Sequence, residues 1–265
     1  MKKLLLLLTL WGMVAVGCTD DLDGINNGCE ILYTSTSGKI VKPHQSTSRS
    51  TFGADILSNM YLNGQGVITF DSQVTSIGES AFYGANRLES IIIPSTVTSI
   101  GESAFRDCGN LASVDMPSGL VSIGNQAFRD CDNLRSVTIP NVTSIEAFAF
   151  SDCENLASVT IGSSIASIGR FAFSDCPNLR SVTIGSSIVS IGEFAFNPST
   201  IYYEQHLFVY CKATTPPSLG IGVFPSTFYD YSNVSIYVPT RSVSAYKSAY
   251  DWKPYAHRIF GYDFE

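Results

Sequence analysis

The chain has 265 residues and a formal net charge of −7, because 23 acidic residues outnumber 16 basic ones. A nucleic-acid-binding protein is expected to carry a basic patch, and no cluster of Lys and Arg stands out in this sequence. Apolar and aromatic residues make up 45% of the chain, which is enough to build a folded core. The composition therefore disfavours both a nucleic-acid binder and a disordered chain.

The first residues are typical of a secretory signal. Two lysines precede an apolar run from Leu4 to Val16, which is too short to span a bilayer. Small residues then lead to Cys18 in an order that resembles a bacterial lipobox, although Ala15 stands where such motifs usually carry Leu. We expect residues 1–17 to be a lipoprotein signal peptide and Cys18 to be lipidated. The alternative is an ordinary secretory signal with a cysteine nearby by chance.

Two segments separate this signal from the repeats. Residues 18–28 form an acidic tether, which resembles the export signal of some surface lipoproteins of Gram-negative anaerobes, or else is a solvated linker. Residues 29–66 are expected to form an N-terminal β cap. Within it, Ile31–Tyr33 and Lys39–Val41 flank Ser37 and Gly38 as the strands of a hairpin would.

A repeated phrase fills residues 67–199. It reads S-I-G-x-x-A-F, then D-C-x-N-L-x-S-V-x-I, and its steps are 22 or 23 residues long. A period in this range predicts a solenoid, in which each repeat is one coil stacked on the previous coil. The isoleucines of the first part mark six repeats: Ile77, Ile100, Ile123, Ile145, Ile168 and Ile191.

Each coil has a recognisable internal plan. The S-V-x-I segment alternates polar and apolar residues, which predicts a short strand, and stacked coils would pair these strands in a parallel sheet. The glycine after S-I implies either a positive φ or close contact between coils. Glu146 replaces it in the repeat that is one residue short, so we expect a local irregularity there. The A-F segment is expected to form a helical turn or irregular backbone, and the Phe column from Phe82 to Phe196 is expected to be the core.

Two polar columns could suggest metal binding. Cys108, Cys131, Cys153 and Cys176 occupy one column, but stacking at ~4.8 Å per coil spreads their sulfurs too far to converge on one ion. We predict buried free thiols there rather than a metal site or disulfides. The aspartate column is read either as a calcium ladder or, preferably, as carboxylates that cap backbone amides of their own turns. Its members are Asp107, Asp130, Asp152 and Asp175.

The sequence offers little catalytic chemistry. Its three histidines, His44, His206 and His257, lie far apart without ligand spacing. No nucleophile elbow and no phosphate-binding loop is visible. We therefore predict no enzyme, no catalytic residue, no metal and no cofactor. An enzyme whose catalytic groups come from distant segments remains a rival hypothesis.

Residues 200–265 are expected to form an aromatic-rich C-terminal cap. Leu207–Tyr210 and Val234–Val238 are predicted strands, and Thr240 or Ser242 is predicted to cap a short helix. The aromatic residues of this cap either form its own core, which we favour, or present a platform for a glycan or a protein.

The repeat also resembles a known family. The segments Ser99–Pro117 and Ser122–Pro140 are similar to the BspA-like leucine-rich-repeat proteins of host-associated anaerobic bacteria. The ending from Ile236 to Trp252 resembles the closing module of that group. The resemblance implies a leucine-rich-repeat solenoid of six repeats, a parallel β-sheet with short helical or irregular turns, capped at both ends by β-rich modules. It also implies a surface protein for adhesion or recognition.

These observations lead to a functional hypothesis. We expect a lipoprotein on the outer membrane whose solenoid binds a surface or matrix protein of a host or neighbouring cell. The alternative is a glycan-binding lipoprotein of a nutrient-capture system, working through the C-terminal aromatic residues. Because side chains alternate along a strand, the polar residues of S-V-x-I point outward. We place the binding site on these outward residues and expect a modest, micromolar affinity. The candidate ligand-binding residues are Ser113, Asp115, Arg135, Ser136, Thr138, Ser158, Thr160, Arg180, Ser181 and Thr183.

Overall fold

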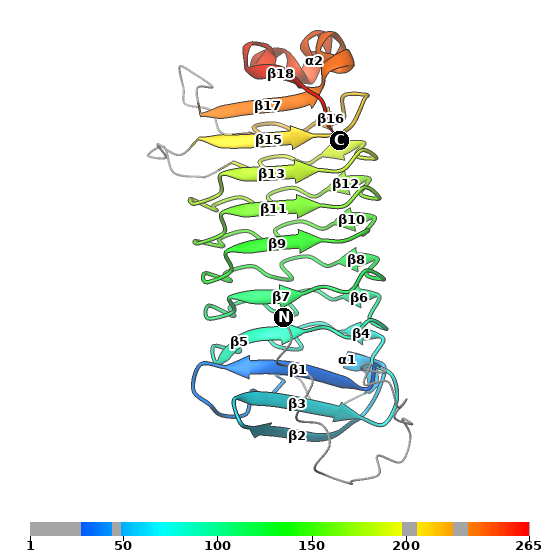
Figure 1. The fold of residues 1–265 in the computed structure, drawn as a ribbon, viewed down its shortest axis with the longest axis vertical. Coiled ribbons are helices and arrows are strands. Elements are labelled where there is room, and N and C mark those ends of the chain that lie inside the picture. The colour runs from blue at the N-terminus through cyan, green and yellow to red at the C-terminus, as the bar shows by residue number, and fades with distance from the viewer. Residues whose placement is uncertain (1–27, 44–48, 198–205, 225–232, 265) are drawn as a thin grey trace.

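The repeats coil into an elongated stack of parallel strands, as the fold-class prediction stated (Figure 1). The computed structural model describes residues 28–43, 49–197, 206–224 and 233–264. Each coil contributes one longer strand to one side of the stack. These strands belong to two sheets that meet between β7 and β9, and they appear in Figure 1 in the order β2-β3-β1-β5-β7, then β9-β11-β13-β15-β17-β18.

The bounds of the longer strands follow the repeat closely. In the first sheet they are β1 (Glu30–Ser35), β2 (Ile56–Leu62), β3 (Gln65–Phe70), β5 (Leu88–Ile92) and β7 (Ser113–Asp115). In the second sheet they are β9 (Ser136–Ile139), β11 (Ser158–Ile161), β13 (Ser181–Ile184), β15 (Leu207–Cys211), β17 (Val234–Pro239) and β18 (Ile259–Tyr262).

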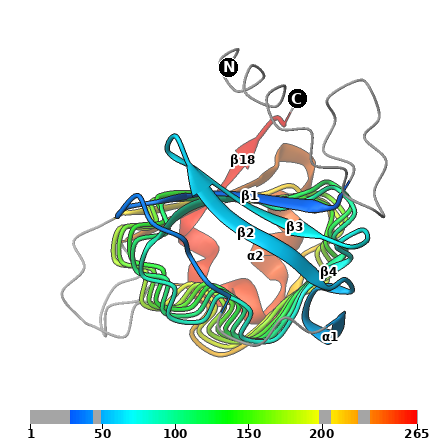
Figure 2. The ribbon, with the colours of Figure 1, turned by 90° about the horizontal axis from the view of Figure 1, so that it is seen from below.

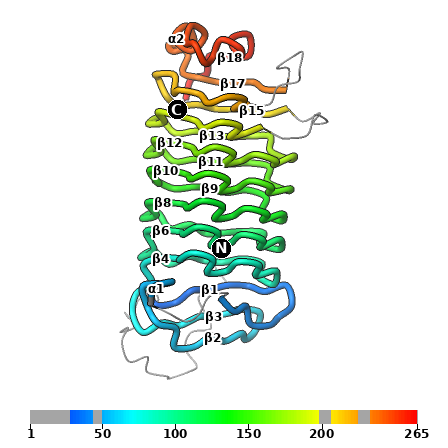
Figure 3. Tube along the Cα trace, turned by 180° about the vertical axis from the view of Figure 1, so that it is seen from behind, coloured from blue at the N-terminus to red at the C-terminus, as the bar shows by residue number. Residues whose placement is uncertain are grey.

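The Ser-Ile pairs of the repeat form a further parallel sheet, which the sequence analysis did not predict. Seen from behind, these two-residue strands follow one another along the stack (Figure 3). Each isoleucine side chain is buried, and each pair lies in register with the pair of the next coil. The strands are β4 (Ser76–Ile77), β6 (Ser99–Ile100), β8 (Ser122–Ile123), β10 (Ser144–Ile145), β12 (Ser167–Ile168), β14 (Ser190–Ile191) and β16 (Ser218–Leu219).

The A-F segments are turns of irregular backbone, so the second of the two expectations for them is correct. The glycine column is explained by close contact between coils and not by positive φ. A Cβ atom at Gly124 would lie 2.7 Å from the carbonyl carbon of Gly101 in the previous coil. Positive φ instead occurs two residues later, for example 56° at Gln126 and 57° at Phe148.

The expected irregularity near Glu146 lies mainly in the turn before it. In the neighbouring coil, the Leu120 amide donates to the carbonyl of Pro117, whereas the Val142 amide donates to the carbonyl of Pro140. The missing residue therefore shortens this turn, and β10 keeps its register with both neighbouring strands.

A ladder of phenylalanine rings runs through the interior, which confirms the Phe column as core. From Phe82 to Phe196 the rings are buried and stack with centroids 4.9–5.3 Å apart. The ladder continues to Phe52 in α1 (Arg49–Phe52) at one end and to Phe224 at the other. One continuous core therefore joins the coils to both caps.

The N-terminal cap differs from the predicted hairpin. Lys39–Val41 is not a strand, and β1 pairs antiparallel with β3 on one side and β5 on the other. The hairpin is β2–β3, joined by Asn63 and Gly64, whose φ angles are 53° and 84°. Such a pair of positive φ angles is what a tight two-residue hairpin turn requires.

The C-terminal cap contains both predicted strands and the predicted helix. After η1 (Thr240–Ser242), α2 (Val243–Ser248) and η2 (Tyr250–Arg258) cover the end of the stack. The Ser242 side chain makes no capping hydrogen bond. Instead, the Tyr246 hydroxyl donates to the carbonyl of Ala213 at 2.9 Å, and the Trp252 indole donates to that of Pro217 at 2.8 Å. These buried hydrogen bonds fix the cap to the last coils.

Candidate binding face

The outward side of the longer strands is the candidate binding face. Val137 and Ile139 of β9 point inward and are buried, so Ser136 and Thr138 point outward and are exposed. Parallel pairing without a register shift then aligns equivalent hydroxyls in two rows. The serine row is Ser136, Ser158 and Ser181, and the threonine row is Thr138, Thr160 and Thr183.

The remaining predicted site residues lie at the borders of these rows. Ser113 and Asp115 are exposed on β7, one coil before β9. Arg135 and Arg180 are exposed directly before β9 and β13, and Ala157 takes the equivalent position between them. The structure thus places the eight predicted strand residues along the outer side of the longer strands and the two arginines, exposed, at the starts of β9 and β13. Hydroxyls there can donate and accept hydrogen bonds, and guanidinium groups can bind acidic groups.

The same rows continue into aromatic side chains. Ser181 pairs in register with Phe208, and Thr183 pairs with Tyr210, which pairs in turn with Tyr237 and then with Phe260. We call this part the aromatic end; it comprises Phe208, Tyr210, Tyr237, Phe260 and Tyr262. The candidate face therefore changes along its length from hydroxyl-lined to aromatic.

The rings of the aromatic end pack against one another, two of them stacked face to face and a third across them. Tyr210 and Tyr237 stack with centroids 5.0 Å apart and planes 13° from parallel. Tyr262 stands nearly perpendicular to both rings, at 72° and 74°. Phe208, Phe260 and Tyr262 are each 38–45% exposed. Aromatic rings packed against one another in this way are held rigidly, and their exposed parts offer apolar contact area to a partner.

The expectation that the aromatic residues of the C-terminal cap form its core is correct for only some of them. Phe224, Tyr246, Trp252 and Tyr255 are buried, whereas the aromatic end lies at the surface. Strict alternation in Leu207–Cys211 separates inward Leu207 and Val209 from outward Phe208 and Tyr210, and this signal could have identified the surface rings. Five further aromatic residues of the predicted C-terminal cap lie outside the described residues: Tyr202, Tyr203, Phe228, Tyr229 and Tyr231.

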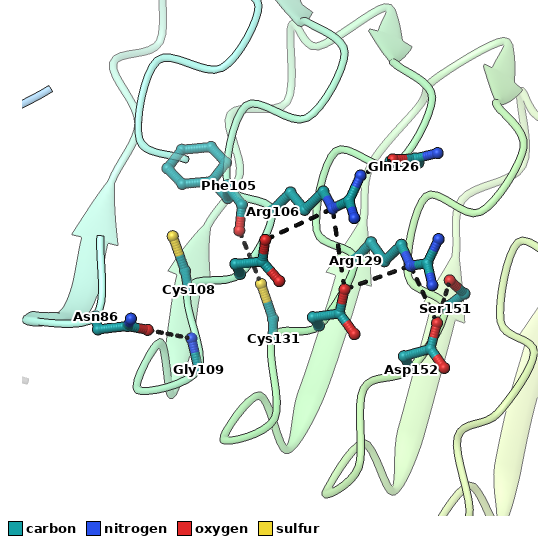
Figure 4. Close-up of polar contacts among 12 residues, drawn as sticks. Asn86, Phe105, Arg106, Cys108, Gly109, Gln126, Arg129, Cys131, Ser151 and Asp152 are labelled. Carbon is teal, nitrogen blue, oxygen red and sulfur yellow. Dashed lines mark hydrogen bonds and ion pairs between the residues drawn. The ribbon is translucent and has the colours of Figure 1, made fainter. Parts of the chain in front are cut away.

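The cysteine column lies inside the stack, as predicted, and its thiols are free. Each thiol donates to a Phe carbonyl, for example Cys108 to Phe82 at 3.0 Å. Figure 4 shows the equivalent bond from Cys131 to Phe105, at 3.2 Å. Burial raises the pKa of Cys108 to about 12. The pKa of Cys131 is raised for the same reason. These thiols therefore stay protonated at neutral pH and are poor nucleophiles.

Three members of the aspartate column, Asp107, Asp130 and Asp152, form ion pairs in place of the predicted amide caps. Arg129 lies 3.3 Å from the carboxylate of Asp130 in its own coil and 3.1 Å from that of Asp152 in the next (Figure 4). Arg106 contacts Asp107 and Asp130 in the same way, at 3.7 and 4.0 Å. The aspartates also have φ near 59°, which Asp tolerates better than most residues. Arg106 and Arg129 thus each lie between carboxylates of adjacent coils.

Burial, the largest effect, raises the pKa of Asp130, although Arg129 acts against it. His206 accepts or donates a hydrogen bond with Ser235 at 2.9 Å, and burial lowers its pKa.

His44 and Cys18 lie outside the described residues. Within the described ranges, no three His, Cys, Asp or Glu side chains gather as metal ligands would. None of the helices in those ranges combines the length and hydropathy that a bilayer crossing requires.

Comparison with known proteins identifies the repeat. The family described as BspA type Leucine rich repeat region matches in six copies over residues 58–144 and 122–215. No curated protein matches the chain. Among solved structures, the leucine-rich repeat protein of T. pallidum is 31% identical, with a TM-score of 0.52, over 57% of this chain and 69% of that one.

Two further structures share lower identity. The pneumococcal vaccine antigen PcpA is 20% identical, with a TM-score of 0.49, over 70% of this chain and 42% of its own. A leucine-rich repeat protein from Bacteroides ovatus is 21% identical, with a TM-score of 0.32, over 68% of this chain and 61% of its own. Since the family's repeat covers more than half of the sequence, the chain belongs to the BspA-type leucine-rich-repeat family.

Proposed function

We propose that this protein is a cell-surface lipoprotein that recognises a protein on a host or neighbouring cell through the candidate binding face. The family supports a recognition role in general. The observation that carries the proposal is the continuity of the face, in which two hydroxyl rows lead in register to the aromatic end.

The two parts of the face suit different contributions to binding. Buried aromatic side chains are common anchors of protein interfaces, and Tyr210 and Tyr237 supply them in rigid form. Rows such as Thr138 and Thr160 offer hydrogen bonds that fix the orientation of a partner but add little affinity each. We therefore expect micromolar affinity per molecule, with many copies on one cell raising the overall strength of attachment.

A second candidate function is glycan binding, and the aromatic end favours it specifically. The apolar face of a sugar ring can lie against an exposed ring of this end, such as Phe260 or Tyr262, while its hydroxyls find polar neighbours. Thr183 and the exposed Lys212 provide such groups beside the aromatic end. In this case the hydroxyl rows would contribute little.

A pair of variants separates these possibilities. Tyr237→Ala with Phe260→Ala removes the aromatic end, and Thr138→Arg with Thr160→Arg blocks the hydroxyl rows. For a protein partner we expect both double variants to weaken binding to a panel of matrix proteins by about tenfold or more. Loss through the aromatic variant alone, together with binding on a glycan array, would instead support the glycan function.

The control for this experiment is Val189→Arg, which changes an exposed residue on the other side of the stack. Circular dichroism and thermal unfolding should show that all variants remain folded. If both double variants bind the matrix proteins and the glycans as the unchanged protein does, the candidate face is scaffold and the proposal is wrong.

The anchoring part of the proposal is tested at Cys18. Cys18→Ala removes the thiol that would carry the lipid, so the protein should leave the membrane fraction and lose metabolic labelling with a fatty acid. Cys211→Ala, which removes a buried thiol far from the signal, should keep both. Persistent lipid labelling of the Cys18→Ala protein would show that the anchor is elsewhere.

A further inference from the structure

The N-terminal end of the stack carries exposed apolar side chains. Figure 2 views the molecule from this end and shows β2 and β3 crossing the end of the coils. The exposed fraction rises from 38% for Ile40 to 67% for Leu62, with Leu57 and Met60 between them. We call this surface the end face; it consists of Lys39, Ile40, Lys42, Leu57, Met60 and Leu62.

Local structure explains why these side chains point away from the core. Met60 and Leu62 alternate with Asn59 and Tyr61 along β2, and the register shifts at Leu57, so all three apolar residues remain exposed. The segment after β1 is held against β2, because the side-chain amide of Asn59 donates to the carbonyl of Val41 at 2.9 Å. The end face is therefore a fixed surface rather than a loose loop.

An uncovered surface of this kind is uncommon on soluble proteins. Edge strands are usually protected by charged residues or proline, and β2 contains neither. Four of the eleven large apolar side chains that are exposed in the described residues lie on the end face. Clustered exposure of this sort marks an interaction surface.

The charge of the end face differs from that of the whole chain. The exposed charged side chains of residues 28–43 and 50–70 are Lys39 and Lys42, while Glu30 and Asp55 are half-buried. The complete chain is acidic, with a net charge of −7. Apolar side chains bordered by lysines are suited to the boundary between headgroups and acyl chains of an anionic membrane. A second copy would instead bring like charges together.

The position of the chain end favours the same occupant. The described fold begins in this cap at Gly28, whose carbonyl accepts a hydrogen bond from the Val74 amide. About ten residues separate it from Cys18, and they can span no more than about 35 Å. A lipid on Cys18 would therefore keep the end face close to the membrane and raise its effective concentration there.

We propose that the end face rests on the surface of an anionic lipid bilayer, so that the stack stands with its aromatic end away from the membrane. This inference rests on the proposed anchoring at Cys18. It adds a second contact, because the lysines would meet lipid headgroups while Leu57, Met60 and Leu62 enter the interface. Such a contact would fix the orientation of the candidate binding face relative to the cell surface.

The test measures whether the end face touches lipid. The chain from Thr19 onward, with an N-terminal histidine tag, is held on phosphatidylglycerol vesicles that contain nickel-chelating lipid. A polarity-sensitive fluorophore is attached at Met60→Cys in a chain that also carries Cys29→Ser, since Cys29 is disulfide-bonded in the structure and the free cysteines of the described residues are all buried. The matched control carries the fluorophore at Ile221→Cys, which is 73% exposed in the C-terminal part of the stack.

We expect lipids brominated in their acyl chains to quench the fluorophore at residue 60 and leave that at residue 221 unchanged. Lys39→Glu with Lys42→Glu should lower the docked fraction by about tenfold or more. Equal quenching at both positions would overturn the proposal. So would a shift at residue 60 that depends on protein concentration without vesicles, which would indicate a second copy. Because the tag replaces the lipid, this result is independent of whether Cys18 is lipidated.

Discussion

Replacing Phe128 by alanine should lower the free energy of unfolding by about 3–5 kcal/mol. The Phe128 ring is buried, and it stacks between Phe105 at 4.9 Å and Phe150 at 5.0 Å. Its removal leaves a cavity in the middle of the ladder, where the neighbouring rings are held by their own coils and cannot move in. Because each coil contacts only its neighbours, the loss falls on the two interfaces that join the halves of the stack.

Reversible denaturant unfolding measures this effect, and Phe148→Ala is its control. Phe148 is also aromatic and stacks on Phe171 at 4.9 Å, but its side chain is only partly buried and its φ is 57°. Phe148→Ala should lower the free energy of unfolding clearly less than Phe128→Ala, since removing a partly exposed ring opens no internal cavity. A loss below about 1 kcal/mol for Phe128→Ala would contradict the assignment of this column to the core.

The coil could be predicted from sequence because its interior repeats in phase. The Phe and Cys columns recur at one fixed step, and a position that is apolar or small in every coil reports its burial directly. The Ser-Ile strands were not predicted for a physical reason. Two residues such as Ser122 and Ile123 are too few to show alternation, so only stacking of complete coils reveals that they form a sheet.

The N-terminal cap was predicted less well because its pairing is not local. β1 lies between β3 and β5, although β2 and β3 separate it from β5 in the sequence. The dipeptide Asn63-Gly64 does carry a local signal for the hairpin, since it is the preferred sequence of a tight turn. The pattern around Gly38 also predicts a hairpin turn, but only the segment before it is a strand.

The candidate site was predicted in part. The hydroxyl rows follow from period two within S-V-T-I, and their registers align as stacking requires. That the rows lead into Tyr210 and Tyr237 depends on the register between β13, β15 and β17, across long intervening segments. No repeat fixes that register, so the sequence left the hydroxyl strip and the aromatic residues as competing sites, whereas they lie on one face.

Replacing Gly124 by alanine should destabilise the stack by about 1–3 kcal/mol. A Cβ atom at this position would lie 2.7 Å from the carbonyl carbon of Gly101 and 2.8 Å from the amide nitrogen of Glu102. Both atoms belong to the backbone of the previous coil, so a side-chain rotation cannot relieve the overlap. The coils must move apart at a point where hydrogen bonds and ring stacking hold them together.

The matched control is Gly109→Ala, because its Cβ atom would meet only side-chain oxygens, at 3.7 and 3.8 Å. That change should shift the free energy of unfolding by no more than about 0.5 kcal/mol. Equal losses for the two variants would show that close contact between coils is not what requires the glycine.

The chain itself contains a natural comparison at this column. The amides of Gly101, Gly124, Gly169, Gly192 and Gly220 donate to an isoleucine carbonyl of the previous coil at 2.7–2.8 Å. At Glu146, the one position of the column with a side chain, the equivalent bond to Ile123 is 3.1 Å long. A Cβ atom is therefore accommodated by separating the coils and lengthening their hydrogen bond. Gly124→Ala should impose the same separation on a coil whose turn has not been shortened, and it should act without changing the fold.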